Sequence, residues 1–152
     1  LLRGFKGHKN YNIHYALPPN DYGRYYAGMD VAIAPLQMNN FNDSKSDIKV
    51  AECSRYKIPL VASNVGSYDE TIINGETGYL IDPDAPKSEW TKVLTKLCKD
   101  KKHRIELGKN LNEQTKDRYD GRKQSQQRYD LYMRAMQDLG HKLDEQDNQH
   151  SD

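Results

Sequence analysis

The sequence predicts an α/β fold in which helices flank a parallel β-sheet. Two continuous apolar runs, 31–36 and 60–63, have the length and composition of strands that are buried on both faces. A segment with helical periodicity, 44–56, separates them, and a third short apolar run, 79–81, follows. Strands that alternate with helices connect through right-handed crossovers, and the result is a parallel sheet.

The segments around the first strand are predicted from turn and spacing signals. Residues 12–17 predict a short strand that ends at two prolines. A helix is expected next, capped by Asn20 or Asp21, because four residues recur at helical spacing. They are Tyr22, Tyr25, Tyr26 and Met29. The asparagine-rich residues 37–43 predict a loop.

The second half of the chain is predicted to be mostly helical. A turn at Gly66 leads to a short helix over 68–73, and longer helices are expected over 86–98, 102–115 and 121–139. The first of these longer helices carries a strong apolar stripe. It consists of Trp90, Val93, Leu94, Leu97 and Cys98. The chain is therefore divided into a sheet domain over 1–120, a C-terminal helix over 121–139, and a polar tail over 140–152 that is expected to be disordered.

Composition narrows the class of protein. The 23 basic and 22 acidic residues give a net charge of +1, which argues against a nucleic-acid partner. No apolar run approaches the roughly 20 residues of a membrane span, so no such span is expected. The N-terminus lacks methionine and a signal peptide, and we expect a cytoplasmic protein cut from a longer one. Cys53 and Cys98 are expected to be free thiols, and neither they nor the histidines have the spacing of a metal site.

Four motifs follow one another in the segment 44–83. They are Ser44-x7-Glu52, then Ile58-Pro59-Leu60-Val61-Ala62-Ser63, then Gly66-Ser67-Tyr68-Asp69-Glu70, and last Gly75-Glu76-Thr77-Gly78-Tyr79-Leu80-Ile81. Together they resemble the nucleotide-sugar-binding half of the group 1 (retaining, GT-B) glycosyltransferases. In that family a carboxylate-x7-glutamate helix precedes a G-x-P-V-V-A-S strand, a G-G-x-x-E turn and a G-x-T-G-x-L-V turn and strand. The resemblance covers about residues 12–111.

The resemblance implies a Rossmann-like domain, the C-terminal half of a GT-B fold. Such a protein transfers a sugar, typically a hexose, from a nucleotide diphosphate donor such as a UDP- or GDP-sugar to an acceptor. Neither a metal nor a cofactor is expected. The implied partners are the nucleotide sugar, an unidentified acceptor and a separate or missing N-terminal domain, which would hold the catalytic groups. The alternative is a binding or assembly module that keeps this fold without the reaction.

Seven residues are predicted to bind the donor. They are Ser44, Lys45, Ser46, Asp47, Lys49, Glu52 and Gly66. The loops after the first two strands lie where ligands bind in open parallel sheets, and a helix N-terminus there favours a diphosphate. Lys45 and Lys49 could add positive charge. The resemblance assigns the ribose to Glu52 and places Ser44 where the family has a glutamate near the donor sugar, a loss that Asp47 could compensate.

Each of these residues also has a structural interpretation. Ser44 and Asp47 fit a capping box, and Glu52 could pair with Lys49 or Arg55 on a helix surface. Gly66 could serve only the turn, and the tyrosine cluster could serve only packing.

Two arrangements are open for the C-terminal helix. It crosses onto an N-terminal domain, as the resemblance implies, or it docks on its own sheet.

Overall fold

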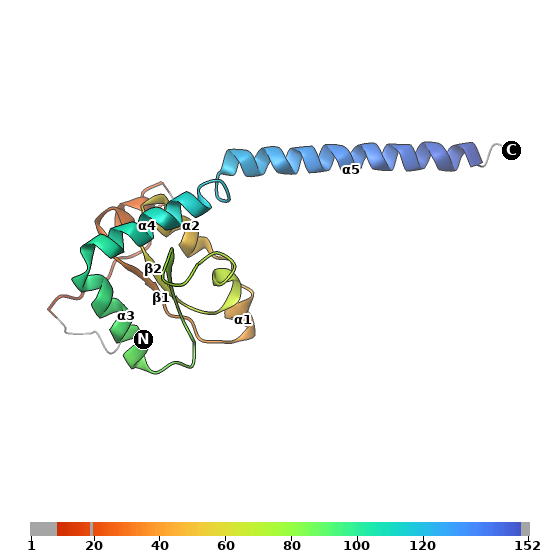
Figure 1. Ribbon diagram of the computed structural model, residues 1–152. Helices are drawn as coiled ribbons and strands as arrows, with labels where there is room; N and C mark the ends of the chain where they lie inside the picture. The colour runs from red at the N-terminus through yellow and green to blue at the C-terminus, as the bar shows by residue number, and fades with distance from the viewer. Residues whose placement is uncertain (1–8, 19, 150–152) are drawn as a thin grey trace.

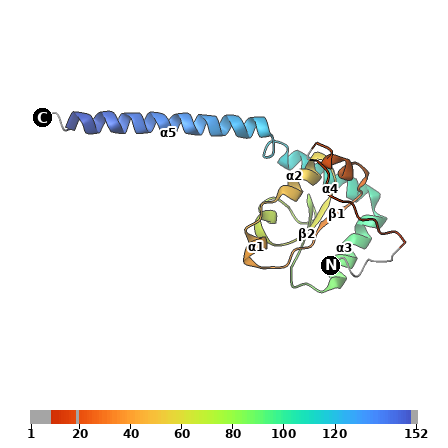
Figure 2. The same ribbon diagram turned by 180° about the vertical axis from the view of Figure 1, so that it is seen from behind.

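A three-stranded parallel sheet with helices on both faces forms the body of the computed structural model (Figures 1 and 2), which describes residues 9–18 and 20–149, without the side chains of 141–149. The strands are β1 (Ala32–Ala34), β2 (Leu60–Ser63) and β3 (Gly78–Ile81), in that order across the sheet. The register places Val61 beside Ile33 on one side and beside Tyr79 on the other.

Strand β2 is the centre of the sheet, and it occupies the predicted residues. All four of its residues are buried. Successive side chains of a strand point to opposite faces, so Leu60 and Ala62 belong to one apolar cluster and Val61 to another. Strand β1 forms an edge among the described strands, and its Ile33 side chain is 53% exposed.

The described part of the chain contains seven helical segments, and all but the last of them surround the sheet. They are η2 (Tyr22–Gly28), α1 (Asn40–Asp43), α2 (Ile48–Arg55), η3 (Gly66–Tyr68), α3 (Lys87–Lys99), α4 (Lys101–Thr115) and α5 (Gly121–Gln149), the two η segments being 3-10 helices. Val50 of α2 packs in the first cluster, and Leu97 of α3 packs in the second. Helix α4 joins both clusters, because Leu111 lies in the first and Leu107 in the second.

Several sequence predictions about local structure were wrong. Residues 12–17 form no strand and are mostly exposed. The predicted loop 37–43 contains α1, because the side chain of Asn39 accepts a hydrogen bond from the Asn42 N–H and caps a helix there. This added helix delays α2, which begins at Ile48 rather than near 44. The helix predicted over 68–73 is reduced to η3 and a turn.

The C-terminal helix α5 projects away from the domain in both views (Figures 1 and 2). It ends at Gln149, beyond the predicted end at 139, since Gly140 is tolerated inside the helix and good helix formers such as lysine, leucine and glutamate follow. The expected tail is therefore helical up to Gln149, and 150–152 lie outside the described residues. Among the described helices, none is long and apolar enough to cross a membrane.

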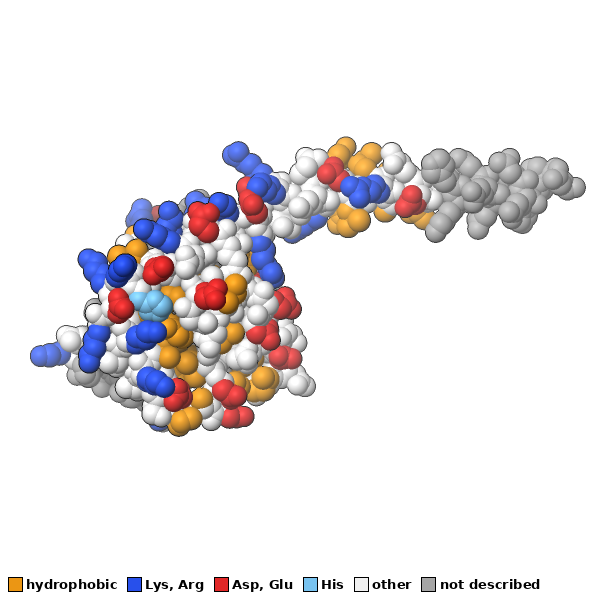
Figure 3. All heavy atoms as spheres, viewed as in Figure 1, with side chains coloured by type: hydrophobic (Ala, Val, Ile, Leu, Met, Phe, Trp, Pro, Cys, Tyr) orange, Lys and Arg blue, Asp and Glu red, His pale blue; other side chains and the backbone are white. Residues whose placement is uncertain are grey.

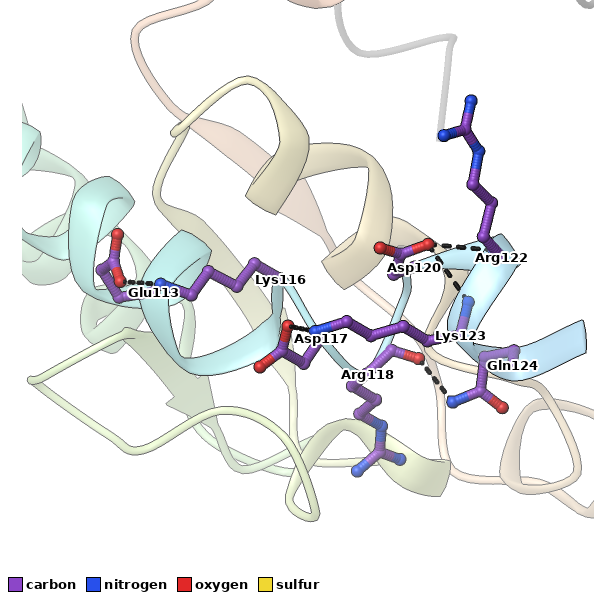
Figure 4. Close-up of polar contacts among 8 residues, drawn as sticks. All are labelled: Glu113, Lys116, Asp117, Arg118, Asp120, Arg122, Lys123 and Gln124. Atoms are coloured by element: carbon purple, nitrogen blue, oxygen red, sulfur yellow. Dashed lines mark hydrogen bonds and ion pairs between the residues drawn. The ribbon is translucent and has the colours of Figure 1, made fainter. Parts of the chain in front are cut away.

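Polar contacts fix the link between α4 and α5 (Figure 4). Asp120 accepts a hydrogen bond from the backbone N–H of Arg122 at 2.9 Å, as a helix cap does. Lys123 pairs with Asp117, and the Gln124 amide donates to the carbonyl of Arg118 at 3.1 Å. These contacts bind the first turn of α5 to the link that precedes it.

Candidate functional site

The two loops that the sequence nominates as the ligand site are in contact with each other. The N–H of Gly66 donates to Asp43 Oδ1 at 3.3 Å, and Ser67 Oγ donates to the Lys45 carbonyl at 3.2 Å. Gly66 has a φ of 64°, and a Cβ there would lie 3.1 Å from the carbonyl oxygens of Asn42 and Asp43. A glycine is therefore required for the turn after β2 to pack against the loop before α2.

Residues 44–46 lie on the surface of this loop. Ser44 ends α1, and its hydroxyl donates to the Asn40 carbonyl at 2.8 Å. Lys45 Nζ donates to Asn42 Oδ1 at 2.7 Å and lies 4.5 Å from the centre of the Phe41 ring. The side chain of Ser46 is exposed. The capping-box interpretation is wrong, because Ser44 belongs to the preceding helix.

Asp47 is turned into the domain, away from the surface of the loop. It is the N-cap residue of α2, but its side chain makes no cap hydrogen bond. Its Oδ2 accepts from Thr71 Oγ1 at 2.6 Å and from the hydroxyl of Tyr119, and Arg118 lies 3.7 Å away. Burial raises the pKa of Tyr119, and the hydrogen bond to Asp47 raises it further. Asp47 thus ties the start of α2 to the turn after η3 and to the α4–α5 link.

Glu52 lies one turn further along α2 at the centre of a polar cluster. Its Oε2 accepts from Lys49 Nζ at 2.8 Å and from the hydroxyl of Tyr26 at 2.6 Å. Lys49 also donates to the hydroxyls of Tyr22 and Tyr26, at 3.2 and 3.0 Å. Burial alone would lower the pKa of Lys49, but these hydrogen bonds outweigh it and raise the pKa, so the ammonium stays charged. The sequence left two ion-pair partners open for Glu52, Lys49 and Arg55. In the structure Glu52 pairs with Lys49.

The tyrosine cluster therefore contacts the candidate site residues in addition to packing. Tyr26 bonds to both Glu52 and Lys49, and Tyr22 bonds to Lys49. Tyr26 is buried, and its ring stacks on Tyr56 with the ring centres 5.6 Å apart. Burial raises its pKa, and the hydrogen bond to Glu52 adds to the effect, so Tyr26 remains a hydrogen-bond donor at neutral pH. Sequence spacing finds the cluster but not its contact with Glu52, because η2 and α2 are adjacent only in the folded chain.

Glu52 borders two surface hollows. One has a volume of about 330 Å³, and residues from η2 line it together with α2. The other, of about 570 Å³, lies between α2 and the end of α4. The side chain of Glu52 is 23% exposed. A carboxylate oxygen, an ammonium and tyrosine hydroxyls at such a place can bind a hydroxyl-rich ligand with little rearrangement. The described residues contain no cluster of three or more His, Cys, Asp or Glu that could hold a metal ion.

Comparison with known proteins identifies the family. The family model described as Glycosyl transferases group 1 matches residues 5–115. This chain belongs to the group 1 glycosyltransferases. The D-inositol 3-phosphate glycosyltransferase of Corynebacterium kroppenstedtii is 31% identical over 96 residues, which are 63% of this chain and 20% of that protein. The α-1,3/1,6-mannosyltransferase alg-2 of Neurospora crassa is 45% identical over 40 residues, 26% of this chain and 8% of that protein.

Two solved structures confirm the fold. The C-terminal domain of the glycosyl transferase group 1 protein LpcC from Francisella tularensis superposes with a TM-score of 0.59 at 21% identity, covering 70% of this chain and 52% of that one. Sucrose-phosphate synthase from Thermosynechococcus elongatus gives 0.63 at 22% identity, covering 74% and 27%. The predicted C-terminal half of a GT-B fold is confirmed. The chain spans about a fifth of the length of the curated relatives it matches.

Proposed function

We propose that this chain is the donor-binding part of a glycosyltransferase that moves a sugar from a nucleotide diphosphate sugar to an acceptor without a metal ion and with retention at the sugar carbon. The names of the matched relatives support a sugar transfer. The family match reaches residue 115, so the site loops and α2 all lie inside it. The rest of the enzyme, with its catalytic groups, belongs to an N-terminal domain that faces this one, and a cytoplasmic location fits such an enzyme.

The observation that carries the proposal is the fixed position of Glu52 beside two hollows. Lys49 and Tyr26 both contact Oε2, and Oε1 accepts no hydrogen bond from a described residue. That oxygen is available to a ribose hydroxyl, and the held carboxylate loses little side-chain freedom when it binds. We therefore assign the ribose to Glu52, with Lys49 as the residue that positions it.

The diphosphate is assigned to the loop surface in front of α2. The helix begins at Ile48, and its first N–H groups have no acceptor within the helix. Lys45 and Ser46 are exposed beside it, and the turn at Gly66 forms the opposite wall. Ser44 is assigned to the donor sugar. Asp47, although predicted as a site residue, is given the structural role described above, because its carboxylate is buried and bonded to Thr71 and Tyr119.

A second candidate function is supported by Ser44. The Ser44 hydroxyl, which donates to the Asn40 carbonyl, can accept a hydrogen bond from a sugar hydroxyl, but it lacks the charge of the glutamate expected at this position. A module that binds the nucleotide sugar without transferring it would tolerate that change. The two candidates share a donor site and differ only in whether the sugar is transferred.

Calorimetric titration with UDP, GDP and ADP and a hexose conjugate of each tests the donor site. Glu52→Gln is expected to weaken the nucleotide that binds by about 10- to 100-fold, the loss of one hydrogen bond to a charged group. Glu106→Gln on exposed α4 is the matched control and should bind as the wild type does. Equal affinity of wild type and Glu52→Gln, with both chains folded, would refute the assignment of Glu52.

Transfer of labelled sugar from the donor that binds separates the two candidates. We expect transfer when the chain is supplied with a GT-B N-terminal domain and acceptor. Donor binding without any transfer in that mixture would favour the non-catalytic module.

A further inference from the structure

The smaller of the two hollows beside Glu52 is lined mainly by residues of η2 and of the end of α2. Its volume is about 330 Å³, and several of its lining residues are tyrosines. The described lining residues are Asn20, Tyr22, Gly23, Tyr26, Glu52, Arg55 and Tyr56. The larger hollow, of about 570 Å³, has one aromatic residue in its described lining, Tyr119, and the hydroxyl of that residue is bonded to Asp47. The two hollows therefore offer different surfaces to a ligand that is held at Glu52.

Two tyrosine rings are stacked at the smaller hollow. The planes of Tyr26 and Tyr56 lie 10° apart, with the ring centres 5.6 Å from each other, and Tyr56 remains 38% exposed. Gly23 permits this placement, because a Cβ at position 23 would lie 2.0 Å from the hydroxyl oxygen of Tyr56. A flat ring that enters the hollow can extend the stack. Every nucleic-acid base has a π-face that stacks on aromatic side chains in this way.

Arg55 brings unused hydrogen-bond donors to the same hollow. Glu52 pairs with Lys49, and Arg55 is exposed and makes no hydrogen bond or ion pair with any described residue. A guanidinium has five N–H donors and no acceptor. Asn20 also lines the hollow, and an amide both donates and accepts. These groups suit a ring whose edge presents a carbonyl oxygen beside an N–H.

This donor pattern fits uracil and guanine better than adenine. Uracil has two carbonyl oxygens, one on each side of an N–H, and guanine has one carbonyl oxygen next to an N–H. Adenine carries an amino group where guanine has its carbonyl oxygen. An amino group at that position would face the N–H donors of Arg55, so the hydrogen bond to the arginine would be lost.

We propose that the smaller hollow binds the base of the nucleotide sugar, that Tyr56 stacks on this base, and that Arg55 selects uracil or guanine over adenine. The inference rests on the proposed function, in which Glu52 binds the ribose. The base is joined directly to the ribose, so it lies next to the residue that binds the ribose, and Glu52 itself lines this hollow. Because Lys49 already neutralises Glu52, Arg55 is free to bind the base.

Calorimetric titration of the full chain with UDP, GDP and ADP tests the selection. The wild type should bind UDP or GDP about 10-fold or more tightly than ADP, since a hydrogen bond to a charged group is gained. Arg55→Ala should remove this preference and leave the affinity for ADP unchanged. Arg134→Ala, at an exposed arginine of α5, is the matched control and should keep the preference. Binding of ADP as tight as that of UDP and GDP, or an unchanged preference in Arg55→Ala, would overturn the role of Arg55.

Tyr56→Leu tests the stacking. It should weaken each nucleotide that binds by about 10-fold, because any base stacks on the ring, whereas Tyr56→Phe keeps the ring and should bind as the wild type does. Tyr129→Leu is the matched control for loss of an exposed tyrosine. Tyr129 and Arg134 both lie on α5, which extends away from the sheet domain (Figure 3). A folded Tyr56→Leu chain with the affinity of the wild type would overturn the base site.

The outcomes separate this inference from the function on which it rests. A folded wild type that binds none of the three nucleotides would refute the donor site and the base site together. Nucleotide binding that depends on Glu52 but on neither Arg55 nor Tyr56 would leave the donor site in place and overturn only the base site.

Discussion

A methyl group at Gly108 would strike the backbone where the site helix ends. Two residues after the last residue of α2, Lys57 has the left-handed conformation, at a φ of 56°, and Gly108 of α4 packs directly on its carbonyl. An alanine Cβ would lie 1.9 Å from that oxygen, and α4 would have to withdraw by about 1.5 Å to reach an ordinary contact of 3.4 Å. Backbone atoms cannot rotate aside as a side chain can. Gly108→Ala should therefore cost about 3 kcal/mol, the upper end for overpacked cores.

Thermal unfolding followed by circular dichroism measures this cost. The melting temperature of Gly108→Ala should fall by roughly 6–12 °C for a chain of this size. Gly121→Ala is the matched control, because nothing lies within 4 Å of its Cβ position at the start of α5, and it should melt within a degree or two of the wild type. If the two variants melt alike, the close approach of α4 to α2 is wrong, and with it the support of the helix that carries Glu52.

Three further predictions concern buried groups. Cys98 should react with a thiol reagent in the native protein and Cys53 only after denaturation, because Cys53 is buried; two fast native thiols would contradict this. Burial raises the pKa of Cys53 from 9.0 to about 12, so its contribution to stability is complete below pH 9 and is lost above it, at about 1.4 kcal/mol per pH unit. Burial also raises the pKa of Tyr119. Denaturant midpoints that stay constant above pH 9 would refute both raised pKa values. Thr71→Val should cost about 1.5–3 kcal/mol by removing a donor from buried Asp47, as chemical denaturation can measure; an unchanged midpoint would contradict that role.

The parts of the fold that the sequence predicted correctly are those where one local signal decides the structure. Strand β2 is a continuous apolar run between a proline and a turn, and it is found at Leu60–Ser63 as predicted. Helix α3 follows from the apolar residues at helical spacing and begins just after Pro86, where a helix start was expected. Both elements bury a face that is already visible as a pattern in the sequence.

The errors occur where a nearby polar side chain, or the absence of a neighbouring strand, determines which secondary structure a segment forms. Residues 12–17 have the composition of a strand, but no strand among the described residues pairs with them. Asn39 caps α1, and that helix takes Ser44 away from the start of α2. A single amide of this kind is not distinguishable from the other asparagines of the segment by composition or spacing.

Motif spacing indicates candidate site residues, but it does not indicate the side chains that hold them in place. The motif spacing nominated Glu52 and the Gly66 turn, and the structure brings the two predicted loops into contact. The partners that hold the site are remote in sequence. Tyr26 reaches Glu52 from η2, and Tyr119 reaches Asp47 from the α4–α5 link. Such pairs depend on how helices pack, which no single sequence pattern reports.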